Sequence, residues 1–202
     1  MKVLGITGGT GCGKTTALNC LLCRGGYLID CDEVYHRLLQ EDQDLLEALD
    51  KRFCGVVTDG ALDRKKLGAI VFADPQALQD LNATIGPFVL RGIEQELDLA
   101  RSQGAPIAAI DAIGLMESGL GDLCDWTIAV TAPLEDRVRR LVAREGITED
   151  YARLRIGAQK SNEEFSKMCD YTLHNDCDSA QAFEERCSAL FDQLLGSGEA
   201  ID

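Results

Sequence analysis

The chain has 202 residues, of which 46% are hydrophobic and 27% charged, a size and composition typical of a globular domain with a sizeable core and not of a disordered chain. Its 34 acidic and 20 basic residues give a formal net charge of −14, which argues against a general binder of nucleic acids or anionic membranes, because phosphate groups are held mainly by Lys and Arg. The apolar run at Met1–Ile6 is too short for a signal peptide, and no stretch reaches the roughly 18 to 20 apolar residues of a membrane span. A cytoplasmic protein acting on a small molecule is therefore expected, with no nucleic-acid or membrane partner.

The cysteines favour a structural role. There are nine of them, an odd number, and no secretory signal precedes them. Cys20 and Cys23 form a CxxC pair, but no second pair follows at a zinc-finger spacing, and the pair lies within an amphipathic helical pattern. Buried, reduced thiols are predicted.

The first part of the chain begins as a strand, a glycine loop and a helix. Val3–Thr7 is a short β-branched run that predicts a buried strand, and a helix is expected from Lys14 to about Arg24. Gly25-Gly26 ends that helix, and Tyr27–Cys31 predicts a second strand. Helical patterns then dominate from Asp32 to about Gln103, with Asp74-Pro75 marking a helix start.

The second part returns to short strands and helices. Ser161-Asn162-Glu163-Glu164 is a capping box and predicts a helix start. The remaining expected elements are strands at Ile107–Ile110, Thr127–Thr131 and Tyr171–His174, helices at Pro133–Glu145, Thr148–Gln159 and Ser179–Leu195, and a frayed tail at Gly196–Asp202.

This alternation predicts parallel βαβ units in an α/β fold, a three-layer sandwich around a parallel five-stranded sheet. One domain is expected over residues 1–202. The helical stretch between the second and third strands is too long for one crossover, so a helical subdomain is expected as an insertion at about 59–101. It is the candidate substrate-binding part.

The loop after the first strand carries the strongest motif. Gly8-Gly9-Thr10-Gly11-Cys12-Gly13-Lys14-Thr15 fits G-x-x-x-x-G-K-[ST] between a predicted strand and a predicted helix. Glycines allow positive φ, so successive backbone N–H groups can turn toward a phosphate, and the following helix adds its positive end. ATP is therefore the expected ligand, with Lys14 on the β- and γ-phosphates and the Thr15 hydroxyl on Mg²⁺. The expected nucleotide-binding residues are Gly11, Cys12, Gly13, Lys14, Thr15 and Thr16.

Two features of this region have alternative interpretations. The Cys12 thiol is either reactive, through the local positive potential, or simply a small tolerated side chain. Asp30 and Asp32 end the second strand, and strand alternation would point both the same way. Asp32 is our candidate for the carboxylate that accepts the proton of an attacking hydroxyl, the alternative being that it only caps the next helix.

Two further acids follow the third strand. Asp111 ends an apolar run at a position like that of a Walker B carboxylate, suited to hold Mg²⁺ directly or through a water, although such residues are also helix caps. Glu117 is expected to begin a helix, either as a substrate contact or as a partner of the helix dipole.

Arginines crowd one helix of this acidic protein. Arg137, Arg140 and Arg144 are spaced to share one helix face. They predict a lid, at about 137–165, that brings charge to the triphosphate, with Arg140 the catalytic candidate and Arg137 the weakest of the three. The alternative is a solvated face paired with Glu135, Asp136 and Glu145.

Together these residues resemble one family, the dephospho-coenzyme A kinases. The resemblance covers nearly the whole chain. It is carried by Leu4 to Thr16, Leu28 to Asp32, Gly60 to Phe72, Ala132 to Glu135 with Arg140 and Arg144, and Gln159 with Cys169 to Asn175.

The resemblance implies a P-loop kinase core with a helical substrate domain and a lid. It implies transfer of phosphate from ATP, with Mg²⁺, to the ribose 3′-hydroxyl of dephospho-coenzyme A, and it identifies Asp32 as the catalytic aspartate. Arg64 matches the family pattern and could contact the acceptor or form a structural ion pair. The chain departs from the family at Gly86-Pro87, usually His-Pro, and at Ile113–Glu117, usually Pro-Leu-Leu-Phe-Glu. Another small-metabolite kinase, such as a nucleoside or shikimate kinase, and a non-catalytic nucleotide-binding regulator are the alternatives.

Overall fold

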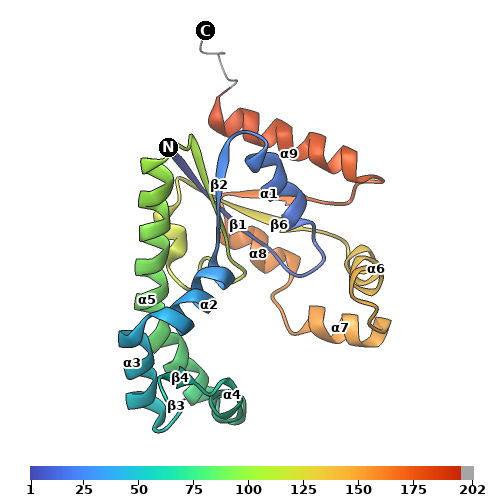
Figure 1. The fold of residues 1–202 in the computed structure, drawn as a ribbon. Coiled ribbons are helices and arrows are strands. Elements are labelled where there is room, and N and C mark those ends of the chain that lie inside the picture. Colours follow the sequence, from blue (N-terminus) through green and yellow to red (C-terminus); the bar gives the residue numbers. More distant parts are fainter. Residues whose placement is uncertain (197–202) are drawn as a thin grey trace. The chain divides into compact units, whose positions relative to one another are not determined.

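The computed structural model describes residues 1–196, so the frayed tail expected at its end lies outside the described residues except for Gly196 (Figure 1). The chain divides into two compact units, one of Ile29–Leu99 and one of Met1–Leu28 together with the chain from Ala100 onward. The elements of the sheet-containing unit are β1 (Lys2–Thr7), α1 (Lys14–Leu22), β2 (Gly26–Asp30), β5 (Ile107–Asp111), η1 (Leu120–Leu123), β6 (Trp126–Thr131), α6 (Leu134–Glu145), α7 (Glu149–Gly157), α8 (Asn162–Met168), β7 (Tyr171–His174) and α9 (Ala180–Leu195).

The central sheet confirms the expected α/β fold. Its five strands run in the order β2-β5-β1-β6-β7, and the β1–β5, β1–β6 and β6–β7 pairs are parallel. The register aligns Ile6 of β1 with Asp111 of β5, so the phosphate loop and Asp111 leave the sheet at the same edge. Asn175 extends the β6–β7 pairing past the end of β7, since its N–H donates to Thr131 O at 2.7 Å.

Helices cover both faces of this sheet. On one face α1 and α9 lie side by side (Figure 1), and their apolar residues form one cluster with alternate residues of the strands. Phe183 and Phe191 of α9 are fully buried in this cluster, together with Leu4 and Ile6 of β1. On the other face α8 packs against β6 and the η1 segment against β1. Gly5 of β1 leaves room for the chain on either side of η1, because a Cβ on Gly5 would lie 2.6 Å from Leu115 and 2.8 Å from Cys124 Sγ.

The α6–α7 hairpin, within the predicted lid, has a small hydrophobic cluster of its own. Val138 and Leu141 of α6 pack against Ala152 and Ile156 of α7. Gly146 ends α6 in the left-handed conformation, and the Thr148 side chain caps α7. The predicted capping box of α8 is present, with Ser161 and Glu164 bonding reciprocally.

The second unit contains α2 (Cys31–Glu41), α3 (Gln43–Phe53), β3 (Val57–Thr58), β4 (Ala61–Leu62), α4 (Arg64–Ala73) and most of α5 (Pro75–Ser102). Its core is a cluster that includes Leu45, Leu49 and Leu67. The unit begins at Ile29, well before the expected insertion at 59–101, because α2 and α3 belong to it. The helix start expected at Asp74-Pro75 is confirmed, since Asp74 accepts from Gln76 N–H at 2.9 Å.

The β3–β4 hairpin was not predicted. It turns at Asp59 (φ 53°) and Gly60 (φ 76°), the two positive φ values of a type I′ turn. Asp-Gly is the usual sequence of such a turn, so this dipeptide was the signal that could have revealed the hairpin. The stretch from Asp32 to about Gln103, where helical patterns were expected to dominate, is mainly helical but contains this hairpin.

All nine cysteines, each among the described residues, are free thiols, as expected, but the expected burial holds for only four of them, and Cys23 and Cys54 are exposed. Cys12, Cys20, Cys31 and Cys187 are buried, and burial raises the pKa of the Cys187 thiol to about 12. Among residues 1–196, no helix combines the length and the apolar character needed to cross a bilayer.

Candidate active site

The phosphate loop has the backbone that its sequence predicts. Gly8, Gly11 and Gly13 all have positive φ, at 141°, 75° and 105°. Side chains are also excluded here by close neighbours, because a Cβ on Gly8 would lie 2.2 Å from Val130 O. Helix α1 begins at Lys14, so its free N–H groups and its positive end face the loop.

Lys14 and Asp111 meet at the end of the sheet. Lys14 Nζ donates to Asp111 Oδ1 at 2.7 Å, and both side chains are about four-fifths buried, at 17% and 21% exposure. The neighbouring loop is fixed as well, since Thr7 Oγ1 donates to Ile113 O at 2.9 Å. Two of the predicted site residues are therefore in direct contact.

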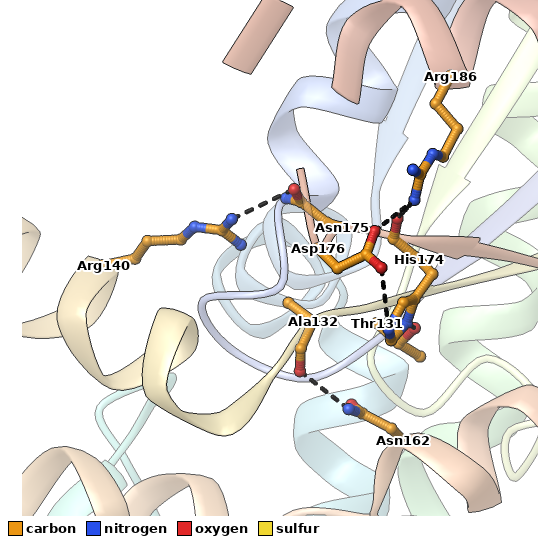
Figure 2. A network of polar contacts seen from close by, with 8 residues as sticks. All are labelled: Thr131, Ala132, Arg140, Asn162, His174, Asn175, Asp176 and Arg186. Atoms are coloured by element: carbon orange, nitrogen blue, oxygen red, sulfur yellow. Dashed lines mark hydrogen bonds and ion pairs between the residues drawn. The ribbon is translucent and has the colours of Figure 1, made fainter. Parts of the chain in front are cut away.

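Arg140 of α6 reaches the phosphate loop, while the lid itself stays a prediction. Its Nη1 donates to Gly11 O at 3.2 Å and to Cys12 O at 3.4 Å. Its Nη2 donates to Asn175 Oδ1 at 3.2 Å, the contact shown in Figure 2. These three contacts leave N–H donors of the guanidinium for an anionic ligand.

Asn175 links Arg140 to the loop. It is buried, and its Nδ2 donates to Cys12 O at 2.9 Å. Gly13 must be glycine at this contact, because a Cβ there would lie 2.4 Å from Asn175 Nδ2. The role of Asn175 in the loop was not predicted from the sequence, where it stood only as a landmark of the closing segment.

The segment around Asn175 is held by a polar network (Figure 2). His174 Nδ1 and Thr131 Oγ1 share a hydrogen bond of 2.7 Å, and Arg186 of α9 pairs with Asp176 at 2.6 Å. Asn162 of α8 donates to Ala132 O at 2.9 Å, which fixes the chain where it leaves β6. These contacts determine where Asn175 presents its amide.

Arg137, which we considered the weakest of the lid arginines, lies on the loop. Its side chain is buried, and its Nε donates to Thr10 O at 2.9 Å. Gln159, just beyond α7, accepts from Thr10 N–H at 2.8 Å. The sequence analysis anticipated neither the burial of Arg137 nor its contact with a loop carbonyl, and its role toward the triphosphate stays a prediction.

Arg144 does not share the loop contacts of Arg137 and Arg140. It is exposed and pairs with Glu145 at 2.6 Å. The solvated-face alternative therefore describes Arg144, as it does Arg139, which pairs with Asp136 at 2.7 Å.

Two predictions about the acids need correction. Glu117 does not begin a helix, because Ile113–Gly119 forms turns, and its carboxylate pairs with Lys160. Asp32 does not share a strand with Asp30, because β2 ends at Asp30 and Asp32 lies in the first turn of α2. Asp30 is the helix cap, accepting from Asp32 N–H at 2.8 Å and Glu33 N–H at 3.2 Å. Asp32 belongs to the second unit, so its role toward the phosphate loop stays a prediction.

The Cys12 side chain turns into the core. It is 1% exposed and belongs to the hydrophobic cluster between the sheet, α1 and α9. Burial raises the pKa of the Cys12 thiol and outweighs the lowering effects of Lys14 and Arg137. A reactive thiol is therefore not favoured, and only the backbone of Cys12 is available to a phosphate.

The second unit has a mainly apolar cavity of about 190 Å³. Arg64 lines it together with Tyr35 and His36 of α2, and the rest of the lining includes Leu62, Leu67 and Val71. No ion pair in the described part of the chain involves Arg64. The alternative that Arg64 forms a structural ion pair therefore gains no support.

The donors at the end of the sheet fit a magnesium ion bound with a nucleotide. Mg²⁺ takes oxygen ligands and keeps most of its shell as water and phosphate oxygens, so one or two protein oxygens suffice. Thr15 offers a hydroxyl beside Lys14, and Asp111 a carboxylate. Within residues 1–196 there is no cluster of three or more His, Cys, Asp or Glu that could hold a metal ion.

Comparison with known proteins assigns the family. The family model described as dephospho-CoA kinase matches residues 2–181. This chain belongs to the dephospho-CoA kinase family. Among curated relatives, the dephospho-CoA kinase of Mesorhizobium japonicum is 36% identical over 200 residues, covering 97% of this chain and 98% of the relative. That of Streptomyces avermitilis is 38% identical over 178 residues, covering 87% and 86%.

Solved structures share the fold of this chain. A protein from Thermus thermophilus is 34% identical, covers 96% of this chain and 97% of its own, and superposes with a TM-score of 0.76. A shikimate kinase from Bacteroides thetaiotaomicron, 15% identical over 96% of this chain and 98% of its own, has a TM-score of 0.52 and shares the fold alone. The P-loop kinase fold predicted from the sequence, with its nucleotide-binding loop, is therefore confirmed.

Proposed function

We propose that this member of the dephospho-CoA kinase family transfers the γ-phosphate of ATP to the ribose 3′-hydroxyl of dephospho-coenzyme A, giving coenzyme A and ADP. The observation that carries the proposal is the phosphate loop. Its glycines have positive φ, Lys14 at its end pairs with Asp111, and Arg140 donates to Gly11 O. The choice of dephospho-coenzyme A as the acceptor rests on the name of the matched family. The reaction is the last step of coenzyme A biosynthesis and would take place in the cytoplasm.

The loop and its arginine bind and neutralise the triphosphate in this proposal. The N–H groups of Gly11, Cys12 and Gly13 donate to the phosphates, with Thr16 near the α-phosphate. Lys14 moves from Asp111 to the β- and γ-phosphates, and Arg140 uses its remaining donors on the charge that develops during transfer. Phosphoryl transfer needs mainly such positioning and neutralisation.

Asp32 is the proposed group that accepts the proton of the attacking hydroxyl. Its carboxylate is exposed, and Asp30 rather than Asp32 caps α2, so that carboxylate is not needed for the helix. Thr15 and Asp111 would hold Mg²⁺, which neutralises phosphate charge when it is bound. The proton moves from the 3′-hydroxyl to Asp32 as the oxygen attacks phosphorus and ADP leaves.

The acceptor contacts are proposed in the second unit. The apolar cavity lined by Tyr35, Leu62 and Leu67 suits the uncharged arm of dephospho-coenzyme A, and Arg64 suits its pyrophosphate. The family departure at Gly86, in α5, lies in open space, since a Cβ on this glycine would have no neighbour within 4 Å.

A coupled ADP-release assay tests this function. Purified protein with ATP and Mg²⁺ is offered dephospho-coenzyme A, adenosine or shikimate, and each rate is compared with ATP alone. We expect turnover with dephospho-coenzyme A far above the other acceptors. Equal rates with all three, or preference for adenosine or shikimate, would contradict the proposed acceptor, and turnover with none would favour a non-catalytic nucleotide-binding protein.

A further inference from the structure

Both backbone groups of Thr10, at the middle of the phosphate loop, are held by side chains from outside the loop. Thr10 N–H donates to Gln159 Oε1 at 2.8 Å, and Thr10 O accepts from Arg137 Nε at 2.9 Å. Arg137 Nη2 also donates to Gln159 Oε1, at 3.1 Å, so the two side chains form one closed arrangement. We call Arg137 and Gln159 the Thr10 clamp.

The clamp is tightly packed. Arg137 is only 4% exposed, and this burial lowers the pKa of its guanidinium. A buried guanidinium is costly unless its donors are paired. The glycines on either side of Thr10 make room for it. A Cβ would lie 2.2 Å from Arg137 Nη2 if added to Gly9, and 2.9 Å from Arg137 O if added to Gly11.

The clamp completes a pattern along the loop. Three successive carbonyls accept from side chains: Thr10 O from Arg137, Gly11 O from Arg140, and Cys12 O from Asn175 and Arg140. A carbonyl bonded in this way cannot also turn toward a phosphate. The peptides of a glycine-rich loop can flip at little steric cost. The side chains that bind these carbonyls therefore oppose a flip that would turn a carbonyl toward the anion.

The clamp also connects the loop to the α6–α7 hairpin. Arg137 is in α6, and Gln159 follows α7, whose last turn it joins through a hydrogen bond from its N–H to Ile156 O at 3.1 Å. The next residue, Lys160, pairs with Glu117 in the loop after β5. A single short segment therefore bonds both to the phosphate loop and to the loop that follows Asp111.

We propose that Arg137 and Gln159 are positioning residues for the phosphoryl donor. They contact neither ATP nor the acceptor; Gln159 binds Thr10 N–H and Arg137 binds Thr10 O. Because this carbonyl is held away from the site, the N–H of Gly11 in the same peptide faces the phosphates. Loss of the clamp weakens ATP binding and slows turnover because the loop then samples flipped peptides. Binding of the acceptor, which depends on other residues, is unchanged.

Gln159 allows a sharp test, because in these contacts it acts only as an acceptor. Gln159→Glu keeps an acceptor oxygen, and its added charge lies next to Arg137. Gln159→Leu removes the oxygen and keeps a similar volume. Losing hydrogen bonds of this kind corresponds to about a 2- to 10-fold loss of affinity for each bond. We therefore expect Gln159→Leu to raise the KM for ATP by several-fold to tens of fold, and Gln159→Glu to stay close to the unaltered protein.

Arg137→Gln is the partner variant, and Arg139→Gln its matched control, since Arg139 is an exposed arginine of the same helix. KM and kcat for each substrate, the direct affinity for a fluorescent ATP analogue, and the thermal unfolding midpoint are measured for all four variants. The direct affinity is read without any acceptor, so it remains informative even if the acceptor is not dephospho-coenzyme A. If Arg137→Gln fails to fold, the two Gln159 variants carry the test.

The proposal predicts weaker ATP binding for Gln159→Leu and Arg137→Gln, no change in KM for the acceptor, and rescue by glutamate. It is overturned if Gln159→Leu only lowers the unfolding midpoint while ATP affinity and kcat stay unchanged. It is also overturned if Gln159→Glu binds ATP as weakly as Gln159→Leu. The loop would then not depend on a hydrogen-bond acceptor at position 159.

Discussion

The Asp32 side chain is not used to cap α2, the helix in which it lies. Asp30, two positions earlier, accepts the N–H groups of Asp32 and Glu33 at the start of α2. An N-cap needs one such acceptor, and Asp30 provides it. The Asp32 carboxylate stays exposed in the first turn of α2.

The first prediction concerns this residue. Asp32→Asn keeps the shape but removes the base, so we expect kcat to fall by about 100-fold or more while ATP affinity is retained. Steady-state kinetics and direct binding of an ATP analogue measure the two quantities. Glu33→Gln is the control, since it removes an adjacent exposed charge from the same turn. Full turnover of Asp32→Asn would show that the proton acceptor is another group.

At the scale of elements, β6 and β7 are joined at their starts by one carboxylate. Asp170 Oδ2 accepts from both the N–H and the hydroxyl of Thr127, each at 2.8 Å. These hydrogen bonds lower the pKa of Asp170 below its ordinary value of 3.8. Because the pKa is lower in the folded protein, the contribution of Asp170 to stability is full above about pH 3.8. It is lost as the pH falls below that value toward the folded pKa.

We therefore expect Asp170→Asn to reduce the free energy of unfolding at pH 7 by roughly 1 kcal/mol, a modest value because the side chain is exposed. The difference from the unaltered protein should shrink as the pH is lowered through the range below about 3.8. Urea unfolding at several pH values measures both quantities, with Asp178→Asn as the control. A difference that stays constant down to the lowest pH would contradict this account.

The elements also show what a sequence can and cannot predict. The phosphate loop, the strand Tyr171–His174 and the capping box at Ser161 were predicted because each depends on residues close together in the chain. The Thr10 clamp and the Asn175 contact join residues more than a hundred positions apart, and no periodicity reports them. The Asp59-Gly60 turn was a local signal that the surrounding helical pattern concealed.

At the scale of the whole molecule, an acidic chain gathers positive groups at one place. The formal net charge is −14, yet Lys14, Arg137 and Arg140 all contact the phosphate loop or its neighbouring strand end. The loop N–H groups and the start of α1 add to this local positive potential. The phosphate loop is therefore the place where this acidic protein concentrates positive charge.

The most direct test of the account follows the phosphate itself. The protein is incubated with Mg²⁺, dephospho-coenzyme A and ATP labelled in the γ-phosphate, and the product is identified by mass and by phosphorus NMR. We predict that the label appears as a phosphomonoester on the ribose 3′ carbon, with one ADP for each coenzyme A formed. Label found only as inorganic phosphate, or at another position of the acceptor, would contradict the central claim.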